Sequence, residues 1–277
     1  YLNGDEFADL AVGSPAEGKV YIYFGSLTDN GPGEDPATRE VPASPADVIL
    51  SGPSGSRFGF SVAIGRRTAA DDTANPLIIG APAVGAVPAS AGAAYVVAGG
   101  SLAPGGVLVP PLDPEDLTAG CTTLPSWTCD VTAVAEVVIL TGVLAGSETG
   151  YSVGIGPVLT TGSDDFVVGA RRAQNGTGVA TGAVYVVPET ATDTVLSAAS
   201  VRKIYGPVPA SLTRMPGLGE SVAIADFFDN AGTDELAIGA VGTSPSDSTT
   251  NPNPPGRVYV LNVTASVDGS NVANVDT

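Results

Sequence analysis

Three short motifs recur in a constant order along the 277-residue chain, and this internal repetition restricts the possible folds more than any other feature of the sequence. The first motif is a residue pair ending in glycine and followed by x-Ser-Val: 58–64, 149–155 and 218–224. The second is a short apolar run ending in Gly-Ser or Gly-Ala and one further residue: 10–15, 77–82, 166–171 and 236–241. The third begins Gly-x-x-Tyr: 18–23, 92–97, 182–187 and 256–261. A further short run ending in glycine precedes each first motif: 48–52, 138–142 and 202–206.

Each complete unit therefore supplies four short strands bounded by Gly, Pro and Asp turns. Measured on the second-motif glycines, the period is 67, 89 and 70 residues (13 to 80, 80 to 169, 169 to 239). Four strands per repeat are typical of a β-propeller blade, and apolar runs without alternation suit sheets buried between two neighbours. A β-sandwich does not repeat internally, and a β-helix has much shorter coils. We therefore predict an all-β fold, a β-propeller of four-stranded antiparallel blades.

The motifs resemble the FG-GAP repeat, the blade unit of the integrin α-chain head and of many secreted bacterial proteins. Phe58-Gly59 and Gly80-Ala81-Pro82 carry the resemblance, which extends over nearly the whole chain. Later copies depart from it at the Phe and Pro positions: Thr149, Leu218, Arg171 and Val241. The resemblance implies an extracellular propeller, secreted or at the cell surface, that binds a protein or glycan ligand through loops on one face. The longest such loops are 27–45, 100–132 and 241–255.

We interpret residues 1–277 as a single FG-GAP propeller domain or as part of a larger propeller, with four detectable repeats. The units span approximately 1–45, 46–132, 133–199 and 200–277, and the second contains an insertion with the two cysteines. The first unit is incomplete because it has no first motif. Either the natural polypeptide is longer, or the missing strands come from a neighbouring molecule, because an open blade leaves an unpaired sheet edge. The second option makes the open first blade a surface for self-association.

Oxygen-bearing residues alternate in the turn before the first copy of the second motif. Calcium is bound by six to eight oxygens from carboxylates, Asn side chains and backbone carbonyls on a tightly curled loop. The predicted Ca²⁺ ligands of this turn are Asn3, Asp5, Asp9 and the carbonyl of Phe7. The turn resembles the FG-GAP calcium loop Asp-x-Asn-x-Asp-Gly-x-x-Asp and departs from it at Tyr1 and Glu6. The alternative is a solvated acidic turn.

The fourth unit contains a similar acidic turn, one residue longer, before its second motif. The predicted ligands there are Asp226, Asn230 and Glu235, with Asp229 or Asp234 as a substitute for one of them. The corresponding turns of the second and third units, 71–76 and 161–165, lack the spaced acids. Carboxylates gathered in a loop repel one another without metal, so Ca²⁺ is expected to stabilise the folded state.

The charge and the cysteines narrow the class of protein. With 11 basic and 29 acidic residues the net charge is -18, which argues against nucleic-acid binding because phosphate recognition needs clustered Lys and Arg. No stretch approaches the ~18 consecutive apolar residues of a membrane-spanning helix. Cys121 and Cys129 flank a turn that contains Pro125, which predicts a local disulfide and an oxidising, extracytoplasmic compartment. A redox pair or half of a metal site is the alternative.

The absence of histidine excludes Ser-His-Asp and Cys-His nucleophiles and His-containing metal sites. Paired carboxylates could perform glycoside hydrolysis, and 71–72, 113–116 and 164–165 have suitable residue types. Adjacent acids in a strand point to opposite faces, so we predict that the chain is not an enzyme. The Arg pairs 66–67 and 171–172 are expected to form salt bridges with the acids of 71–72 and 164–165, or to anchor an acidic ligand.

The function that agrees best with these features is an extracellular, calcium-binding, integrin α-like propeller that serves in adhesion and binds a protein or glycan. One alternative is the accessory propeller of a secreted hydrolase or lyase whose catalytic domain is absent from this sequence. The other is a self-assembling structural subunit of a filament or coat. Turnover of glycans or phospholipids would favour the first alternative, and concentration-dependent assembly the second.

Overall fold

The computed structural model describes thirteen ranges of the chain: 2–4, 7–25, 46–65, 75–83, 91–98, 121–122, 127–131, 137–190, 192–207, 217–227, 232–241, 256–263 and 272–274. For 121–122, 127–129 and 272–274 it describes the backbone alone. Every named secondary-structure element in these ranges is a β-strand, which confirms the predicted all-β class. Within them there is no helix of the length and hydrophobicity needed to cross a membrane.

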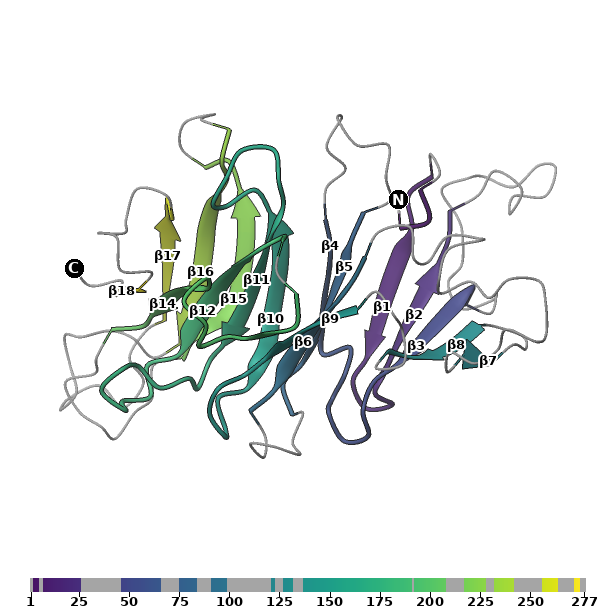
Figure 1. Cartoon of the computed structure of the whole chain (residues 1–277), viewed down its shortest axis with the longest axis horizontal. Helices are drawn as coiled ribbons and strands as arrows, with labels where there is room; N and C mark the ends of the chain where they lie inside the picture. Colours follow the sequence, from purple (N-terminus) through teal and green to yellow (C-terminus); the bar gives the residue numbers. More distant parts are fainter. Residues whose placement is uncertain are drawn as a thin grey trace.

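The strands form four sheets (Figure 1). Sheet I has the order β1-β2-β3-β8-β7: Leu10–Ser14, Lys19–Tyr23, Val48–Ser51, Trp127–Asp130 and Cys121–Thr122. Sheet II has the order β4-β5-β6-β9-β13: Ser61–Ile64, Leu77–Ala81, Ala93–Val97, Val137–Thr141 and Thr194–Val195. Sheet III has the order β10-β11-β12-β14-β18: Thr149–Gly156, Asp165–Ala170, Ala183–Pro188, Arg202–Tyr205 and Val272–Asn274. Sheet IV has the order β15-β16-β17: Gly217–Ala225, Glu235–Val241 and Arg257–Leu261.

The recurring motifs occupy equivalent strands in each sheet. The first motif forms β4, β10 and β15, the second forms β1, β5, β11 and β16, and the third forms β2, β6, β12 and β17. The run that precedes the next first motif pairs antiparallel with the third-motif strand before it, as β3 with β2, β9 with β6 and β14 with β12. Sheets I, II and III therefore each take strands from two consecutive sequence units. Sheets II and III contain the predicted set of four antiparallel strands.

A fifth, parallel strand extends sheets II and III, and β8 joins sheet I in the same way; these additions were not predicted from the sequence. The pairs are β3–β8, β9–β13 and β14–β18. In the β7–β8 hairpin, Cys121 lies directly opposite Cys129. Directly opposed residues of antiparallel strands have Cα atoms about 4.5 to 5.5 Å apart, within the range that a disulfide requires. The backbone is therefore compatible with the disulfide, which stays a prediction.

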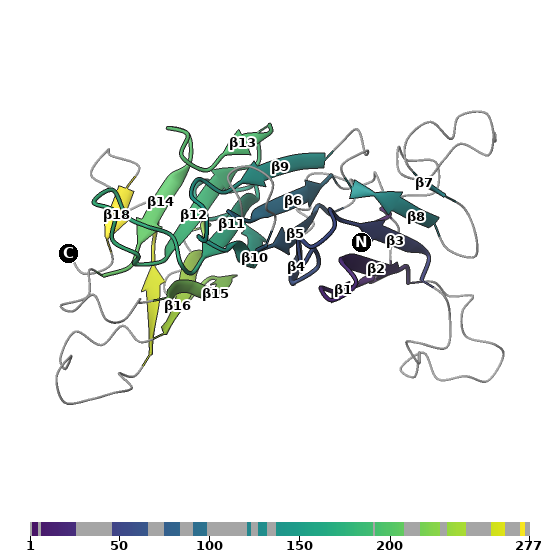
Figure 2. The same cartoon turned by 90° about the horizontal axis from the view of Figure 1, so that it is seen from below.

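The sheets follow one another in sequence order from one end of the molecule to the other (Figures 1 and 2), and none of them closes on itself. Apolar clusters fill the three junctions between them. The first joins sheets I and II: Val20, Leu50, Leu77 and Tyr95 are among its members. The second joins sheets II and III: Ile78, Val96, Val168 and Tyr185. The third joins sheets III and IV: Val167, Val184, Leu236 and Ile238.

Glycines bring the sheets into backbone contact at each junction. The second-motif glycine of one sheet faces the first-motif glycine of the next: Gly13 with Gly59, Gly80 with Gly150, and Gly169 with Gly219. A Cβ atom on Gly80 would lie 2.0 Å from the carbonyl oxygen of Gly150, and Gly150 itself has a φ of +84°. Neither position accepts a larger residue without displacement of the backbone. We call these three contacts the glycine seams.

The residue before the first-motif glycine covers another glycine. Phe58 is fully buried and packs edge-on against Tyr95, with ring centroids 5.4 Å apart. A Cβ atom on Gly52 would lie 2.2 Å from Phe58 Cγ. The Phe-Gly pair thus places a large apolar side chain inside the first junction while the glycine makes the seam.

Candidate functional site

The predicted calcium loops lie only in part within the described residues. Asp5, Asp229 and Asn230 lie outside them, as do most residues of the three long loops proposed for ligand recognition. In the first loop both carboxylate oxygens of Asp9 accept backbone N–H groups, Oδ2 from Leu2 at 2.5 Å and Oδ1 from Gly25 at 2.9 Å. Through these two hydrogen bonds Asp9, the residue before β1, connects Leu2 at the start of the loop with Gly25 after β2.

Glu235 has the same role in the fourth unit. It is fully buried at the start of β16, and its Oε2 accepts the backbone N–H of Phe227 at 2.8 Å. Its Oε1 accepts the Asn262 side-chain amide at 3.5 Å. Asp226 is exposed at the end of β15.

An equivalent acid in the third unit was not among the predicted site residues. Asp165 is buried at the start of β11, and its Oδ2 accepts two backbone N–H groups, from Val158 at 3.0 Å and Leu159 at 2.6 Å. Burial raises the pKa of Asp165 to about 6, although the two backbone hydrogen bonds lower it. The signal was present in the sequence, because an acid immediately precedes the second motif at 9, 165 and 235. We call these three residues the loop acids.

The described part of the first loop can be compared with what a calcium site requires. Oxygen donors such as the Asn3 side chain, the Phe7 carbonyl and the Asp9 carboxylate suit Ca²⁺, and Gly4, with a φ of +83°, curls the loop between them. Within the described ranges, however, no three His, Cys, Asp or Glu residues gather closely enough to hold a metal ion. Of the predicted donors of the first loop, Asn3, Phe7 and Asp9 lie within the described residues and Asp5 does not, so the calcium site stays a prediction.

A second cluster lies at the opposite end of the strands, where two aromatic rings stack between two arginines. Arg57 stacks over the ring of Phe60, with the guanidinium carbon 4.4 Å from the ring centroid. The Phe60 ring lies 4.7 Å from that of Tyr151, and Arg171 covers the other ring of this pair at 3.9 Å from Tyr151. We call Arg57, Phe60, Tyr151 and Arg171 the cation–aromatic strip; it crosses from sheet II to sheet III.

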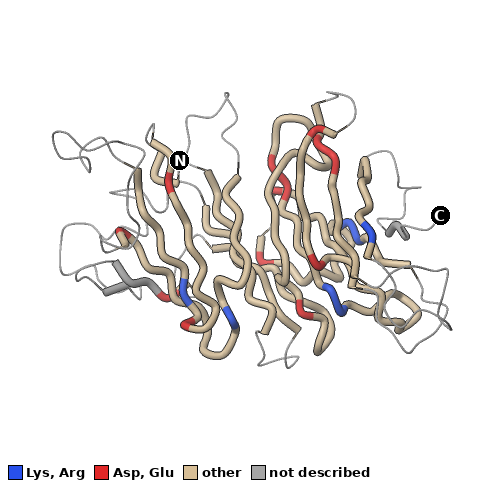
Figure 3. The backbone as a smooth tube through the Cα atoms, turned by 180° about the vertical axis from the view of Figure 1, so that it is seen from behind, with Lys and Arg blue, Asp and Glu red and all other residues tan. Residues whose placement is uncertain are grey.

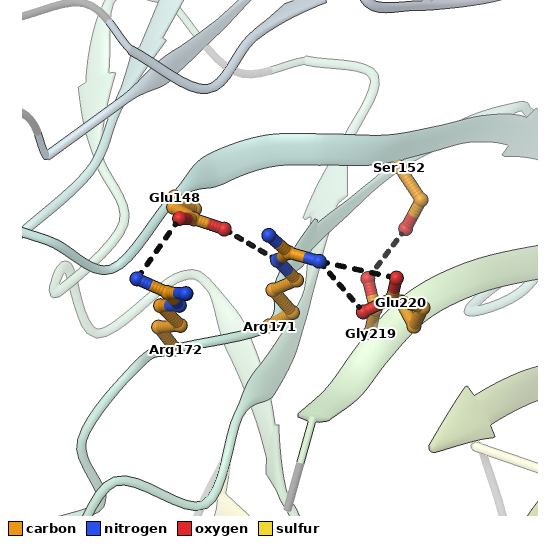
Figure 4. A network of polar contacts seen from close by, with 6 residues as sticks. All are labelled: Glu148, Ser152, Arg171, Arg172, Gly219 and Glu220. Atoms are coloured by element: carbon orange, nitrogen blue, oxygen red, sulfur yellow. Dashed lines mark hydrogen bonds and ion pairs between the residues drawn. The ribbon is translucent and has the colours of Figure 1, made fainter. Parts of the chain in front are cut away.

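Two glutamates hold the end of the strip (Figure 4). Arg171 Nε donates to Glu148, and its Nη1 lies 3.2 Å from an oxygen of Glu220 in sheet IV. Arg172 Nη1 contacts the other oxygen of Glu148 at 3.3 Å. The predicted acidic partners of Arg171 and Arg172 were therefore wrong: Asp164 and Asp165 lie at the opposite end of β11, too far along the strand to reach them. The other arginine pair, 66–67, lies outside the described residues.

The residue before the first motif has a left-handed backbone in the first two of its three copies. Arg57 and Glu148 occupy equivalent positions and have φ values of 58° and 54°. A non-glycine residue in this left-handed region costs roughly 1–2 kcal/mol. Arg57 belongs to the strip, and Glu148 is one of the two glutamates that contact Arg171. At this end of the strands the fold therefore keeps these two side chains in place at a cost in stability.

Sequence reasoning missed the strip because its members come from positions that differ between repeats. Phe60, Tyr151 and Glu220 stand between the conserved Gly and Ser of the first motif. The variation at an otherwise regular position was the available signal.

In Figure 3 the acidic segments reach the upper edge of the molecule, whereas the basic segments lie in its middle and lower parts.

No known family model matches the chain, and no curated protein matches it. The resemblance to FG-GAP repeats therefore depends on the motifs themselves.

Proposed function

We propose that the chain is an extracellular FG-GAP-type β-propeller module, integrin α-like, that serves in adhesion and binds a ligand through the cation–aromatic strip. The observation that carries the proposal is the continuous contact of Arg57, Phe60, Tyr151 and Arg171 across two sheets. The propeller itself is supported by the three equivalent junctions between successive sheets. The role is one of binding and not of catalysis.

The chemistry of the strip favours a glycan as the ligand. The hydroxyls of a sugar can donate to Glu148 and Glu220 and accept from Arg171 and Arg172. Its apolar face can pack beside the half-buried rings of Phe60 and Tyr151, whose faces Arg57 and Arg171 cover. A polyanion is disfavoured by the net charge of -18. A protein ligand would use the same aromatic and Arg side chains as its energetic centre.

Binding of neutral oligosaccharides tests this assignment. We expect at least one member of a panel of β-glucan, xylan, mannan and chitin oligosaccharides to bind in titration calorimetry. Tyr151→Ala should weaken that binding at least tenfold, because loss of a stacked ring costs about 0.5–1.5 kcal/mol beyond the area it buries. Phe227→Ala is the matched control, since Phe227 is exposed and lies beside the acidic loop of the fourth unit.

Binding that is unchanged by Tyr151→Ala and Phe60→Ala would contradict the strip as the binding site. If no oligosaccharide binds but a captured protein ligand is lost on Tyr151→Ala, the strip is a protein-binding site.

Calcium binding is the second part of the proposal. Asn3, Asp5, Asp9 and the Phe7 carbonyl would hold one ion, and Asp226, Asp229, Asn230 and Glu235 a second. Bound calcium would neutralise these loops and hold them rigid. At a free concentration about 100 times Kd, Ca²⁺ should stabilise the fold by ~2.7 kcal/mol per site, and raise Tm by on the order of 5–8 °C.

Asp5→Ala and Asp229→Ala should each remove part of this rise in Tm. They are preferred to substitutions of Asp9 or Glu235, which also hold backbone amides. Glu189→Gln, on the exposed turn after β12, removes the same charge elsewhere and should leave the rise intact. Equal responses to Ca²⁺ in all four proteins would exclude both loops as calcium sites.

A further inference from the structure

The outward face of sheet IV carries exposed apolar side chains, and one of them, Val258, has buried equivalents in other sheets. Val258 in β17 is 71% exposed, and Val241 at the end of β16 is 57% exposed. The residues at the position of Val258 in β6 and β12 are Ala94 and Val184, both fully buried. They are buried because the next sheet in the stack covers them.

The outward face of sheet I has the same property at the other end of the stack. Leu10 and Val12 in β1 are 43% and 40% exposed. Their equivalents in β5, Leu77 and Ile79, are fully buried in the junction with sheet I. In β11 the equivalent of Val12 is Val168, which is fully buried against sheet II.

These two faces are the two halves of one type of contact. At each internal junction the earlier sheet contributes the face that carries its second-motif glycine, and the later sheet contributes the opposite face of its second-motif strand. Two of the three junctions also share a polar contact, in which Ser61 donates to the Gly150 carbonyl at 3.0 Å and Ser152 to the Gly219 carbonyl at 2.8 Å. Sheet IV presents the first kind of face, with Ser221 exposed beside Gly239. Sheet I presents the second, through β1 to β3 and, among the described residues, without the first-motif strand that carries the facing glycine in the other sheets.

We propose that copies of this chain associate head to tail, with the outward face of sheet I of one copy packed on the outward face of sheet IV of the next. The occupant is a second copy because the chain itself forms this junction three times. Sheets I and IV lie at opposite ends of the stack in Figures 1 and 2, so the contact joins different molecules. A heterologous contact of this kind continues into a ring or a filament.

The charge of the chain sets the condition for association. Two copies with a net charge of -18 repel each other, and salt screens this repulsion while it leaves apolar contacts intact. Light scattering at 1 to 200 μM protein measures the molar mass over roughly the micromolar affinities of weak interfaces. We expect this molar mass to rise with protein concentration. It should rise further when NaCl is raised from about 0.05 to about 0.5 M.

Two blocked variants test the polarity of the contact. Val258→Glu places a charge on the sheet IV face, and Val12→Glu places one on the sheet I face. Each variant alone should be monomeric over the whole concentration range. An equimolar mixture should form a dimer and nothing larger, because one competent pair of faces remains. Val195→Glu, at an equally exposed position in β13 outside both faces, should assemble like the parent chain.

A parent chain that stays monomeric at every concentration and salt level overturns the proposal. So does a mixture of the two blocked variants that remains monomeric, or a Val12→Glu, Val258→Glu double variant that still assembles. Far-ultraviolet circular dichroism and Tm establish that each variant is folded. If Val258→Glu does not fold, Val241→Glu blocks the same face and replaces it. Oligosaccharide binding and calcium binding are measured separately, so failure of the assembly leaves the proposed function to its own tests.

Discussion

Gly150→Ala is expected to lower the free energy of unfolding by about 2–5 kcal/mol. The substitution has two costs: a left-handed backbone in a residue with a Cβ atom, roughly 1–2 kcal/mol, and forced repacking of a tight contact, about 1–3 kcal/mol. The new Cβ atom would lie 2.2 Å from the carbonyl oxygen of Ala93, which is backbone and cannot rotate away. Urea unfolding followed by fluorescence measures the change in stability.

Three further glycines separate the two costs. Gly80→Ala has an ordinary φ but a contact at 2.0 Å, so it should show the packing cost alone. Gly178→Ala has a φ of +81° and open space, so it should show the backbone cost alone. Gly176→Ala has an ordinary φ and open space and should be nearly neutral. If Gly150→Ala is no more destabilising than Gly178→Ala, the glycine seams do not hold the sheets together.

Asp165→Asn is expected to make the protein more stable than the parent at pH 7 and to leave stability at pH 4 nearly unchanged. The pKa of the buried carboxyl is about 6 in the folded state, above its ordinary value of 3.8. A raised pKa means that the folded state binds the proton more tightly, so the contribution of Asp165 is fully present below pH 4 and is lost as the pH rises through 6. Two units of pKa correspond to at most about 3 kcal/mol.

The asparagine keeps the geometry and removes the charge. Val158 and Leu159 both donate to Oδ2, so the amide oxygen of Asn can accept both hydrogen bonds. Asp165→Ala cannot accept either, so it should be less stable than Asp165→Asn by about 2–3 kcal/mol at every pH. The informative quantity is the difference in unfolding free energy between variant and parent from pH 4 to 7, since other carboxylates cancel in it. A constant difference for Asp165→Asn would contradict the raised pKa.

The strands were predictable from the sequence because their signals are local. Short apolar runs that begin or end at a glycine mark β4, β5 and β6 and their equivalents in other sheets, and the structure confirms the all-β class. No first motif precedes 10–15, and among the described residues sheet I has no strand equivalent to β4, β10 or β15. The propeller itself stays a proposal, because the four sheets are arranged in series and none closes on itself.

The candidate sites were predictable only in part. The acids that precede the second motif were recognised as oxygen donors at Asp9 and Glu235, but their hydrogen bonds to backbone amides were not foreseen. A carboxylate in a loop has the same sequence signature whether it binds metal or backbone N–H groups. Which of the two it contacts depends on how the chain returns to it, as at Asp165.

By itself, the sequence determined where the strands of the repeated motifs lie and which glycines recur in them, because hydrophobic runs and glycines act on their immediate neighbours. Tertiary structure alone decided that β3, β9 and β14 complete the preceding sheet. It also decided that Arg57, Tyr151 and Glu220, far apart in the chain, lie at the same end of the strands in three successive sheets. The physical reason is that these contacts join segments that are distant in the chain. The burial of whole sheet faces, and not the propensity of any one segment, selects which strands and side chains meet.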